Sequence, residues 1–237
     1  AGALTGDNPL PIKAIAAVVA HNTSGIMSRK GDGIDTPKGL EGKNYATWDL
    51  PIEKAIIKNV VETDGGDFSK VNLIPSTVTD EVSALSSHQV DAIWVYYGWA
   101  GIAANVKGFD FDYFAFKDIN PTFDYYTPVI ITNDDMIKKD SDTIKKFLEA
   151  TKKGYEYAAK NSSDAAKILL KYAPETDEAL AMASQEYLSG FYMDNDIPWG
   201  YIDTNRWKSF YKWLNENNLL ESPIDEGAGL SNEFITK

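Results

Sequence analysis

Cysteine is absent from the 237-residue chain, and histidine is scarce, with His21 and His88 the only two. Without cysteine the protein can form no disulfide, no thiolate metal site and no cysteine nucleophile. Two histidines are too few for a three-histidine zinc site, and they do not form a His-x-x-x-His motif. Neither a Gly-x-Ser-x-Gly nor a Walker-type motif is present. We therefore expect no metal, no cofactor and no enzymatic activity.

Positive charge is also in short supply, because 23 Lys and Arg face 35 Asp and Glu, a net charge of −12. Such a chain repels nucleic acid and anionic lipid headgroups, so we expect neither as a partner. No apolar run approaches the roughly 20 residues that cross a bilayer. The chain begins at Ala1 without a methionine, which we interpret as a processed or trimmed form. With 43% hydrophobic residues, the sequence predicts a packed core.

An apolar run over Val90–Val95 is followed by Tyr96, Tyr97 and Trp99, and then by a helical pattern. The run predicts a buried parallel strand. In open α/β sheets, small ligands collect at the carboxyl ends of the strands. The three aromatic side chains are wide, rigid and polar at one end, and we predict that they hold a small molecule. Ordinary core aromatics are the alternative that the sequence leaves open.

A second group of polar residues follows the strand that we expect over Ile12–Ala20. The stretch His21-Asn-Thr-Ser-Gly25 offers hydrogen-bonding side chains and an accessible backbone, or simply a turn. We expect Asn22, Ser24 and Gly25 to contribute to a binding site. His21 has no paired nucleophile, so we interpret it as structural or surface-exposed.

Trp48 likewise ends a short strand expected over residues 43–48, directly before the N-terminus of a helix expected over residues 50–61. A helix N-terminus carries partial positive charge, which would attract an anion. Asp49 partly offsets this charge and so favours a neutral or cationic ligand. A simple helix cap is an equally good interpretation of Asp49.

The order of elements predicts the fold class. From about residue 24 to residue 116 we expect the order β-β-α-β-α-β-α-β, with Thr79 capping the helix over residues 79–87. Such alternation is typical of an α/β fold with a mainly parallel sheet covered by helices on both faces. After a strand over residues 128–132 the pattern becomes nearly all helical, with apolar stripes over residues 141–160, 164–172, 177–192 and 205–218 that we interpret as core.

Several stretches carry a family resemblance: His21-Asn-Thr-Ser-Gly-Ile26, Gly39-Leu-Glu-Gly-Lys43, Trp48-Asp-Leu-Pro-Ile-Glu-Lys-Ala55, Val90-Asp-Ala-Ile-Trp-Val-Tyr-Tyr-Gly-Trp99, Phe147-Leu-Glu-Ala-Thr-Lys-Lys-Gly-Tyr-Glu-Tyr-Ala158, and Trp207 with Trp213-Leu214. Each is weak alone, but their order and spacing over nearly the whole chain are similar to those of the NMT1/THI5-like substrate-binding proteins of ABC importers. The resemblance implies a type II periplasmic binding protein of two α/β lobes with parallel-dominated sheets.

The resemblance also implies how the lobes divide. Lobe two would span residues 25–125, and lobe one residues 1–24 and 126–237, with crossings near 20–24 and 126–131. Relatives have a further stretch before the position of Ala1, so we expect the first lobe to be incomplete. Apolar surface would then be exposed along residues 12–20 and the C-terminal helices, which permits oligomers.

As to function, the resemblance implies extracytoplasmic capture of a thiamine pyrimidine precursor, a hydroxymethyl- or formylaminomethyl-pyrimidine, for delivery to a membrane permease. The protein would be periplasmic or a cell-surface lipoprotein. The expected ligand-binding residues are Asn22, Ser24, Gly25, Trp48, Tyr96, Tyr97, Trp99 and Tyr126. Ala100 stands where relatives often carry an acidic residue, so a flavin or a sulfonate- or nitrate-like anion remains an alternative ligand. A pyrimidine-synthase-like enzyme is a further alternative, against which the lack of cysteine counts.

Overall fold

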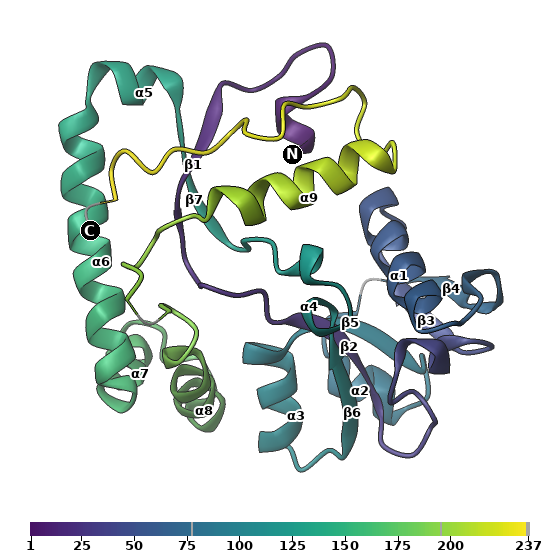
Figure 1. Cartoon of the computed structure of the whole chain (residues 1–237). Helices are drawn as coiled ribbons and strands as arrows, with labels where there is room; N and C mark the ends of the chain where they lie inside the picture. The colour runs from purple at the N-terminus through teal and green to yellow at the C-terminus, as the bar shows by residue number, and fades with distance from the viewer. Residues whose placement is uncertain (77, 195, 236–237) are drawn as a thin grey trace. The chain divides into compact units, whose positions relative to one another are not determined.

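The computed structural model describes residues 1–76, 78–194 and 196–235. The chain forms two compact units, whose elements are labelled in Figure 1. Unit 1 consists of Ala1–Asn22, Asp124–Thr176 and Gln185–Lys237, and unit 2 of Thr23–Phe123 and Asp177–Ser184. Helix α8 (Glu178–Ser189) contributes its first part to unit 2 and its second part to unit 1.

Unit 2 is built on a five-stranded sheet in the order β4-β3-β5-β2-β6. Its strands are β2 (Ser24–Arg29), β3 (Asn44–Thr47), β4 (Asn72–Pro75), β5 (Ala92–Tyr96) and β6 (Phe111–Ala115). Strand β3 runs parallel to β4 and β5, whereas β2 runs antiparallel to β5 and β6. Since β2 is antiparallel to both β5 and β6, the strands β3, β4, β5 and β6 share one direction, as the mainly parallel sheet predicted from the sequence requires, and β2 alone is reversed. The described residues 30–43, which link β2 to β3, form no α-helix, and an α-helical crossover is what normally makes consecutive strands parallel.

The helices of unit 2 are α1 (Pro51–Thr63), α2 (Glu81–Ser86), α3 (Ile102–Val106) and α4 (Phe116–Ile119). Proline opens α1, where its fixed φ and missing N–H cost nothing. Helix α2 is capped by Asp80, whose carboxylate accepts a hydrogen bond from the Ser83 backbone N–H at 3.0 Å. The cap predicted at Thr79 is therefore wrong by one residue.

A two-stranded antiparallel sheet of β1 (Ile12–Ala17) and β7 (Val129–Asn133) lies at the centre of unit 1. The strand expected over residues 12–20 ends early, because the Val18 and Ala20 backbone N–H groups donate instead to Pro128 O and Phe191 O. The remaining helices are α5 (Asp134–Lys139), α6 (Ser141–Lys160), α7 (Ser162–Tyr172) and α9 (Thr204–Glu216). In Figure 1, α6 is the long teal helix.

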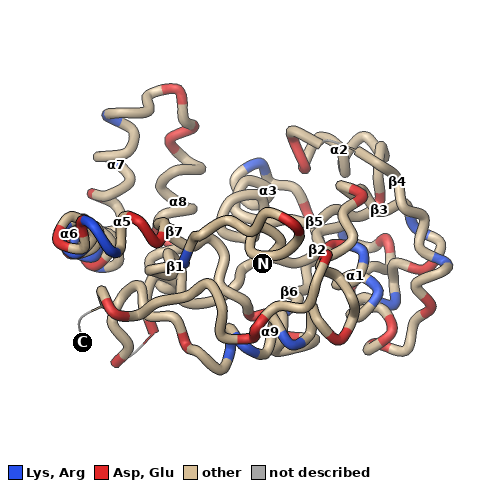
Figure 2. Tube along the Cα trace, turned by 90° about the horizontal axis from the view of Figure 1, so that it is seen from above, with Lys and Arg blue, Asp and Glu red and all other residues tan. Residues whose placement is uncertain are grey.

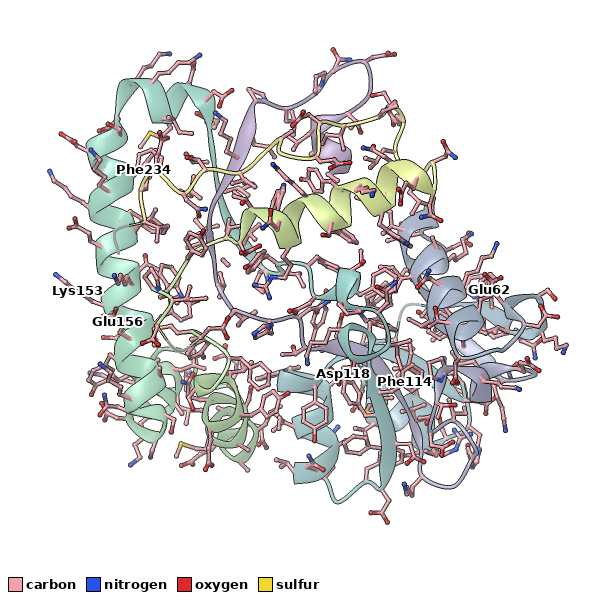
Figure 3. All side chains as sticks on the ribbon, viewed as in Figure 1. Glu62, Phe114, Asp118, Lys153, Glu156 and Phe234 are labelled. Carbon is pink, nitrogen blue, oxygen red and sulfur yellow. The ribbon has the colours of Figure 1, made fainter. Side chains whose placement is uncertain are left out.

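The core of unit 1 joins β1 to α6 and to the C-terminal segment. Ile15 of β1 and Leu148 of α6 are both buried, which confirms the apolar stripe predicted for this helix. Phe234 belongs to the same cluster, and Figure 3 shows it beside α6. These contacts bury the middle of β1, so the apolar exposure expected along residues 12–20 is not observed for Ala14–Ala17.

Helix α6 carries charged residues of both signs, as Figure 2 shows with the helix seen end-on. Lys153 is one of the labelled side chains of α6 in Figure 3. Among the described residues, none of the helices is both long enough and apolar enough to span a membrane.

Candidate functional site

Three half-exposed aromatic side chains follow the parallel strands β3 and β5 of unit 2. Trp48 comes directly after β3, Tyr96 ends β5, and Trp99 lies in the π-helical turn that follows β5. Their exposed fractions are 48%, 42% and 49%. Because Ala46 pairs with Ile93, Trp48 stands level with Val95, one residue before Tyr96. We call Trp48, Tyr96 and Trp99 the aromatic edge.

A buried ring supports the aromatic edge from below. Trp94 is 6% exposed and lies two residues before Tyr96, so both side chains leave β5 on the same face. Its ring centroid is 5.7 Å from that of Trp48 and 4.2 Å from that of Phe116, in tilted geometries that favour aromatic pairs. Within the described part of the chain, the buried Nε1–H of Trp94 has no hydrogen-bond partner.

Glu53, in the first turn of α1, fixes the backbone that carries Trp48. Its buried carboxylate accepts the Trp48 N–H at 3.0 and 3.2 Å and the Tyr45 hydroxyl at 2.6 Å. Burial, together with the charge of Glu53, raises the pKa of Tyr45 well above its ordinary value, so the phenol stays a donor. Sequence reasoning missed Glu53, although a glutamate at the third position of a helix is a recognised capping signal.

Ser24 and Gly25 begin β2, and the antiparallel register sets Ser24 opposite Tyr96. Both residues are buried. A Cβ at Gly25 would lie 2.2 Å from the carbonyl oxygen of Phe114, so only glycine permits this approach of β2 to β6. Ser24 and Gly25 therefore lie beside the strand end that carries Tyr96.

Tyr97 belongs to a different group. Its ring centroid lies 4.9 Å from that of Tyr113, and its backbone N–H donates to Thr23 O at 2.9 Å. Tyr113 packs against the core cluster that contains Val95, which leaves β5 on the face opposite to Trp94. Tyr97 therefore packs on the other face of the sheet from Trp94.

The last two predicted site residues, Asn22 and Tyr126, lie in unit 1. The Asn22 backbone N–H donates to Asp124 Oδ1 at 2.8 Å. Tyr126 stacks over the guanidinium carbon of Arg206 at 3.9 Å and accepts the Asp203 N–H through its hydroxyl at 2.9 Å. The structure thus places Ser24, Gly25, Trp48, Tyr96 and Trp99 around one strand edge of unit 2, and Asn22 and Tyr126 in a cluster of unit 1.

A charged network surrounds these two residues. His21 lies between two carboxylates, with Nδ1 2.6 Å from Asp124 Oδ2 and Nε2 2.9 Å from Asp194 Oδ1. Arg206 Nη1 donates to the same Asp124 oxygen at 2.6 Å. Burial lowers the pKa of Arg206, but contact with Tyr126 and the charge of Asp124 outweigh it, so the net pKa is raised and the guanidinium stays charged.

The network lines a cavity of about 390 Å³ in unit 1. Three tyrosines and several charged side chains form its walls together with small and apolar residues: Ala17, Ala20, His21, Asp124, Tyr126, Tyr192, Met193, Asp194, Ile197, Pro198, Gly200, Tyr201, Asp203 and Arg206. Sequence reasoning singled out only Tyr126 of this set as a site residue. Asp194 and Arg206 are distant from it in the sequence, so no local signal connects them.

The chemistry that these residues offer is stacking, hydrogen bonding and charge pairing. Across the described ranges, no group of three or more His, Asp or Glu side chains is arranged to hold a metal ion. Ala100, in the π-helical turn, is buried. It offers no polar side chain at the position where, as the resemblance implies, relatives often carry an acidic residue.

Comparison with known proteins places the chain in a family. A family model described as "NMT1/THI5 like" matches residues 3–165. The chain belongs to this NMT1/THI5-like family. Among curated proteins, the formylaminopyrimidine-binding protein of Halalkalibacterium halodurans is 25% identical over 230 residues, covering 93% of this chain and 68% of that protein.

Solved structures show how widely the fold of this NMT1/THI5-like chain is shared. The desulfurization enzyme DSZB aligns with a TM-score of 0.68 at 13% identity, covering 98% of this chain and 80% of that one. The alkanesulfonate-binding protein SsuA of Xanthomonas axonopodis pv. citri, bound to MOPS, aligns with a TM-score of 0.68 at 10% identity, covering 93% and 74%. These likenesses confirm the predicted type II periplasmic-binding-protein fold. A fold that carries both an enzyme and a binding protein does not itself decide between them.

Proposed function

We propose that this chain is the extracytoplasmic solute-binding component of an ABC importer and captures a small, flat, uncharged nitrogen heteroaromatic such as a thiamine pyrimidine precursor. The observation that carries the proposal is the aromatic edge of unit 2, half-exposed above the buried Trp94. The family and the relative named for formylaminopyrimidine support a pyrimidine as the ligand class. A membrane permease would receive the solute.

Rigid aromatic plates suit a flat ligand. Each well-placed aromatic contact adds about 0.5–1.5 kcal/mol beyond the burial of apolar area. Glu53 holds the Trp48 backbone, and the Trp94 ring packs against the Trp48 ring. Binding therefore costs little conformational entropy at Trp48. Ser24 and Gly25, beside Tyr96, would border the ligand on the β2 side of the strand edge.

Charge at the aromatic edge disfavours an anionic solute. A helix N-terminus is normally a ready anion site, but here the Glu53 carboxylate already accepts the Trp48 and Leu50 backbone N–H groups. The nearby Lys54 is paired with Asp49 at 2.8 Å. A sulfonate or nitrate would therefore meet a carboxylate where it needs a hydrogen-bond donor. An uncharged heterocycle carries no negative charge for this carboxylate to repel.

Binding without chemistry fits the chain better than catalysis. An enzyme of the NMT1/THI5-like type remains the second candidate because the fold also carries the enzyme DSZB. The chain has no cysteine, and His21 is engaged with two carboxylates instead of a nucleophile. Turnover of a pyrimidine substrate would identify an enzyme.

The proposal is tested by calorimetric titration of hydroxymethylpyrimidine into the wild-type protein and Trp48 variants. Trp48→Ala should weaken binding by about tenfold to a hundredfold, because it removes a ring contact and its buried area. Trp48→Phe should keep most of the affinity. The matched control is Trp207→Phe, because the wild-type Trp207 indole belongs to unit 1 and donates to Ala228 O of the same unit. Equal affinity of Trp48→Ala and wild type would refute the proposed site.

A further inference from the structure

The cavity of unit 1 has an excess of negative charge. Among its lining residues, Asp124, Asp194 and Asp203 face one guanidinium, that of Arg206, so the formal charge is −2 with a neutral His21 and −1 with a protonated one. A concave site with low-dielectric walls concentrates such a field and attracts cations.

Both terminal nitrogens of Arg206, the guanidinium that lines the cavity, already donate to an acceptor. Arg206 Nη1 donates to Asp124 Oδ2 at 2.6 Å, Nη2 donates to Ala20 O at 2.8 Å, and Tyr126 covers the guanidinium carbon. A bidentate anion such as a sulfonate or carboxylate would have to break these contacts. The cavity is therefore poorly suited to an anionic ligand.

Asp194 and Asp203 differ from Asp124 in that each has one carboxylate oxygen with no hydrogen-bond partner among the described residues, and of the two only Asp194 pairs with His21 and also lines the adjoining hollow. Asp124 is shared by His21, Arg206 and the Asn22 N–H, and Asp203 caps α9 through two backbone N–H groups. Asp194 accepts one bond at Oδ1 from His21, and its Oδ2 has no hydrogen-bond partner among the described residues. Its side chain is 33% exposed and lines the cavity.

The walls next to Asp194 are aromatic and apolar. Tyr192 and Tyr201 line the cavity, and Met193, Ile197 and Pro198 complete this side. Aromatic faces attract cations, as Tyr126 and Arg206 already demonstrate in the same cavity. A more open hollow of about 730 Å³ shares Asp194 and Tyr201 and adds Glu156 and Asp196, which extends the acidic character. Glu156 projects from α6 and is labelled in Figure 3.

We propose that the cavity of unit 1 binds the protonated amino group of a small aromatic amine, with Asp194 as the pairing carboxylate and Tyr201 as a wall. The ammonium group would donate to Asp194 Oδ2, and the ring would lie against the tyrosine and the apolar side. This site consists of unit 1 residues alone. Its assignment goes beyond the proposed capture of a neutral heterocycle at the aromatic edge of unit 2.

The experiment compares matched amines and alcohols by calorimetry. The probes are a pyrimidine with an aminomethyl group, the same pyrimidine with a hydroxymethyl group, and the pair benzylamine and benzyl alcohol. A charge-assisted hydrogen bond to Asp194 should make each amine bind at least about tenfold more tightly than its alcohol. No amine preference in either pair, or no detectable amine binding, would overturn the proposal.

Variants then locate the preference. Asp194→Asn should reduce the amine-to-alcohol ratio to within about twofold, since the ammonium loses its charged partner. Glu156→Gln, which changes a carboxylate of the adjoining hollow that does not line the cavity, should keep the ratio. Tyr201→Leu offers a second test if Asp194→Asn fails to fold, and should weaken both amines. An unchanged ratio in folded Asp194→Asn, or unweakened amines in Tyr201→Leu, would contradict the assignment.

The same titrations separate this inference from the proposed function. Trp48→Ala should weaken hydroxymethylpyrimidine at the aromatic edge and leave the affinity for benzylamine unchanged, because Trp48 does not line the cavity of unit 1. An amine preference that depends on Asp194, found together with no effect of Trp48→Ala, would support the cavity and reject the aromatic edge. Equal binding of amine and alcohol that depends on Trp48 would do the reverse.

Discussion

The indole N–H of Trp94 is the residue-scale feature with the clearest energetic consequence. A buried donor without a partner costs free energy that a donor with a partner does not. Trp199, also buried, provides the contrast, because its Nε1 donates to Val18 O at 3.2 Å. Replacement by phenylalanine removes the same volume in the two cases. Both side chains also pack against other rings, so the packing that is lost is of the same kind.

We predict that Trp94→Phe lowers the free energy of unfolding less than Trp199→Phe does, by about 1 kcal/mol. Urea titration followed by circular dichroism measures both. Trp207→Phe, which also removes a donor with a partner, should resemble Trp199→Phe. The account of Trp94 would be wrong if its substitution were the most costly of the three.

At this scale the sequence predicted that aromatic residues stand at the strand ends, but it grouped Tyr97 with Tyr96 and did not predict what holds them. Trp48 and Tyr96 follow apolar runs, and such a pattern is visible along the chain. The link between Glu53 and the Trp48 backbone is also local, and it could have been inferred from capping rules. The contacts of Arg206 with Asp124 and His21 join distant segments, which no spacing along one sequence can reveal.

At the scale of elements, the position of β2 depends on a glycine. A methyl group at Gly25 would meet the Phe114 carbonyl oxygen at 2.2 Å and the Tyr113 ring at 2.7 Å. Gly154 lies within α6, and a methyl group added there would have no atom of another residue within 4 Å beyond its own helix backbone and chain neighbours. The two glycines therefore respond in opposite directions to the same substitution.

We predict that Gly25→Ala destabilises the protein by about 2–3 kcal/mol or prevents folding, because β2 and β6 must separate. Gly154→Ala should stabilise it by about 0.5–1 kcal/mol through helix propensity. Thermal unfolding of both variants beside the wild type measures the effects. Similar melting temperatures for Gly25→Ala and wild type would show that the β2–β6 contact is not as close as described.

The element order and the common direction of β3, β4, β5 and β6 could be predicted from the sequence, and the reversed direction of β2 could not. Apolar periodicity located the strands and helices of residues 24–116 in their correct order. The antiparallel orientation of β2 arises from its pairing with β5 and β6, which are more than 60 residues away in the sequence. Local alternation carries no information on such a pairing.

At the scale of the whole molecule, acid should act strongly on unit 2. The carboxylates whose pKa the structure lowers, through hydrogen bonds and paired cations, all lie in this unit: Glu41, Asp64, Asp67, Asp80 and Asp91. For Asp91, burial raises the pKa, but hydrogen bonds from the Asn44 N–H and Arg29 outweigh it. A carboxylate with a lowered pKa in the folded state stabilises the fold above its ordinary pKa.

We predict that this stabilisation is complete at pH 6 and is lost as the pH falls below the ordinary aspartate value of about 3.9. Asp91→Asn should be less stable than wild type at pH 6 and should lose less stability between pH 6 and pH 3. The net charge of −12 affects the pH response of both proteins in nearly the same way, so the comparison isolates Asp91. Parallel pH profiles for the two proteins would contradict the assignment.

The central claim is that the aromatic edge of unit 2 binds a flat, uncharged heterocycle, and tryptophan fluorescence tests it most directly. Titration of the intact protein with hydroxymethylpyrimidine should give saturable quenching, because Trp48 and Trp99 are half-exposed where the ligand would stack. Nitrate and taurine should give none, since the Glu53 carboxylate occupies the donors that an anion would need. Saturable quenching by the anions, with none by the pyrimidine, would contradict the account.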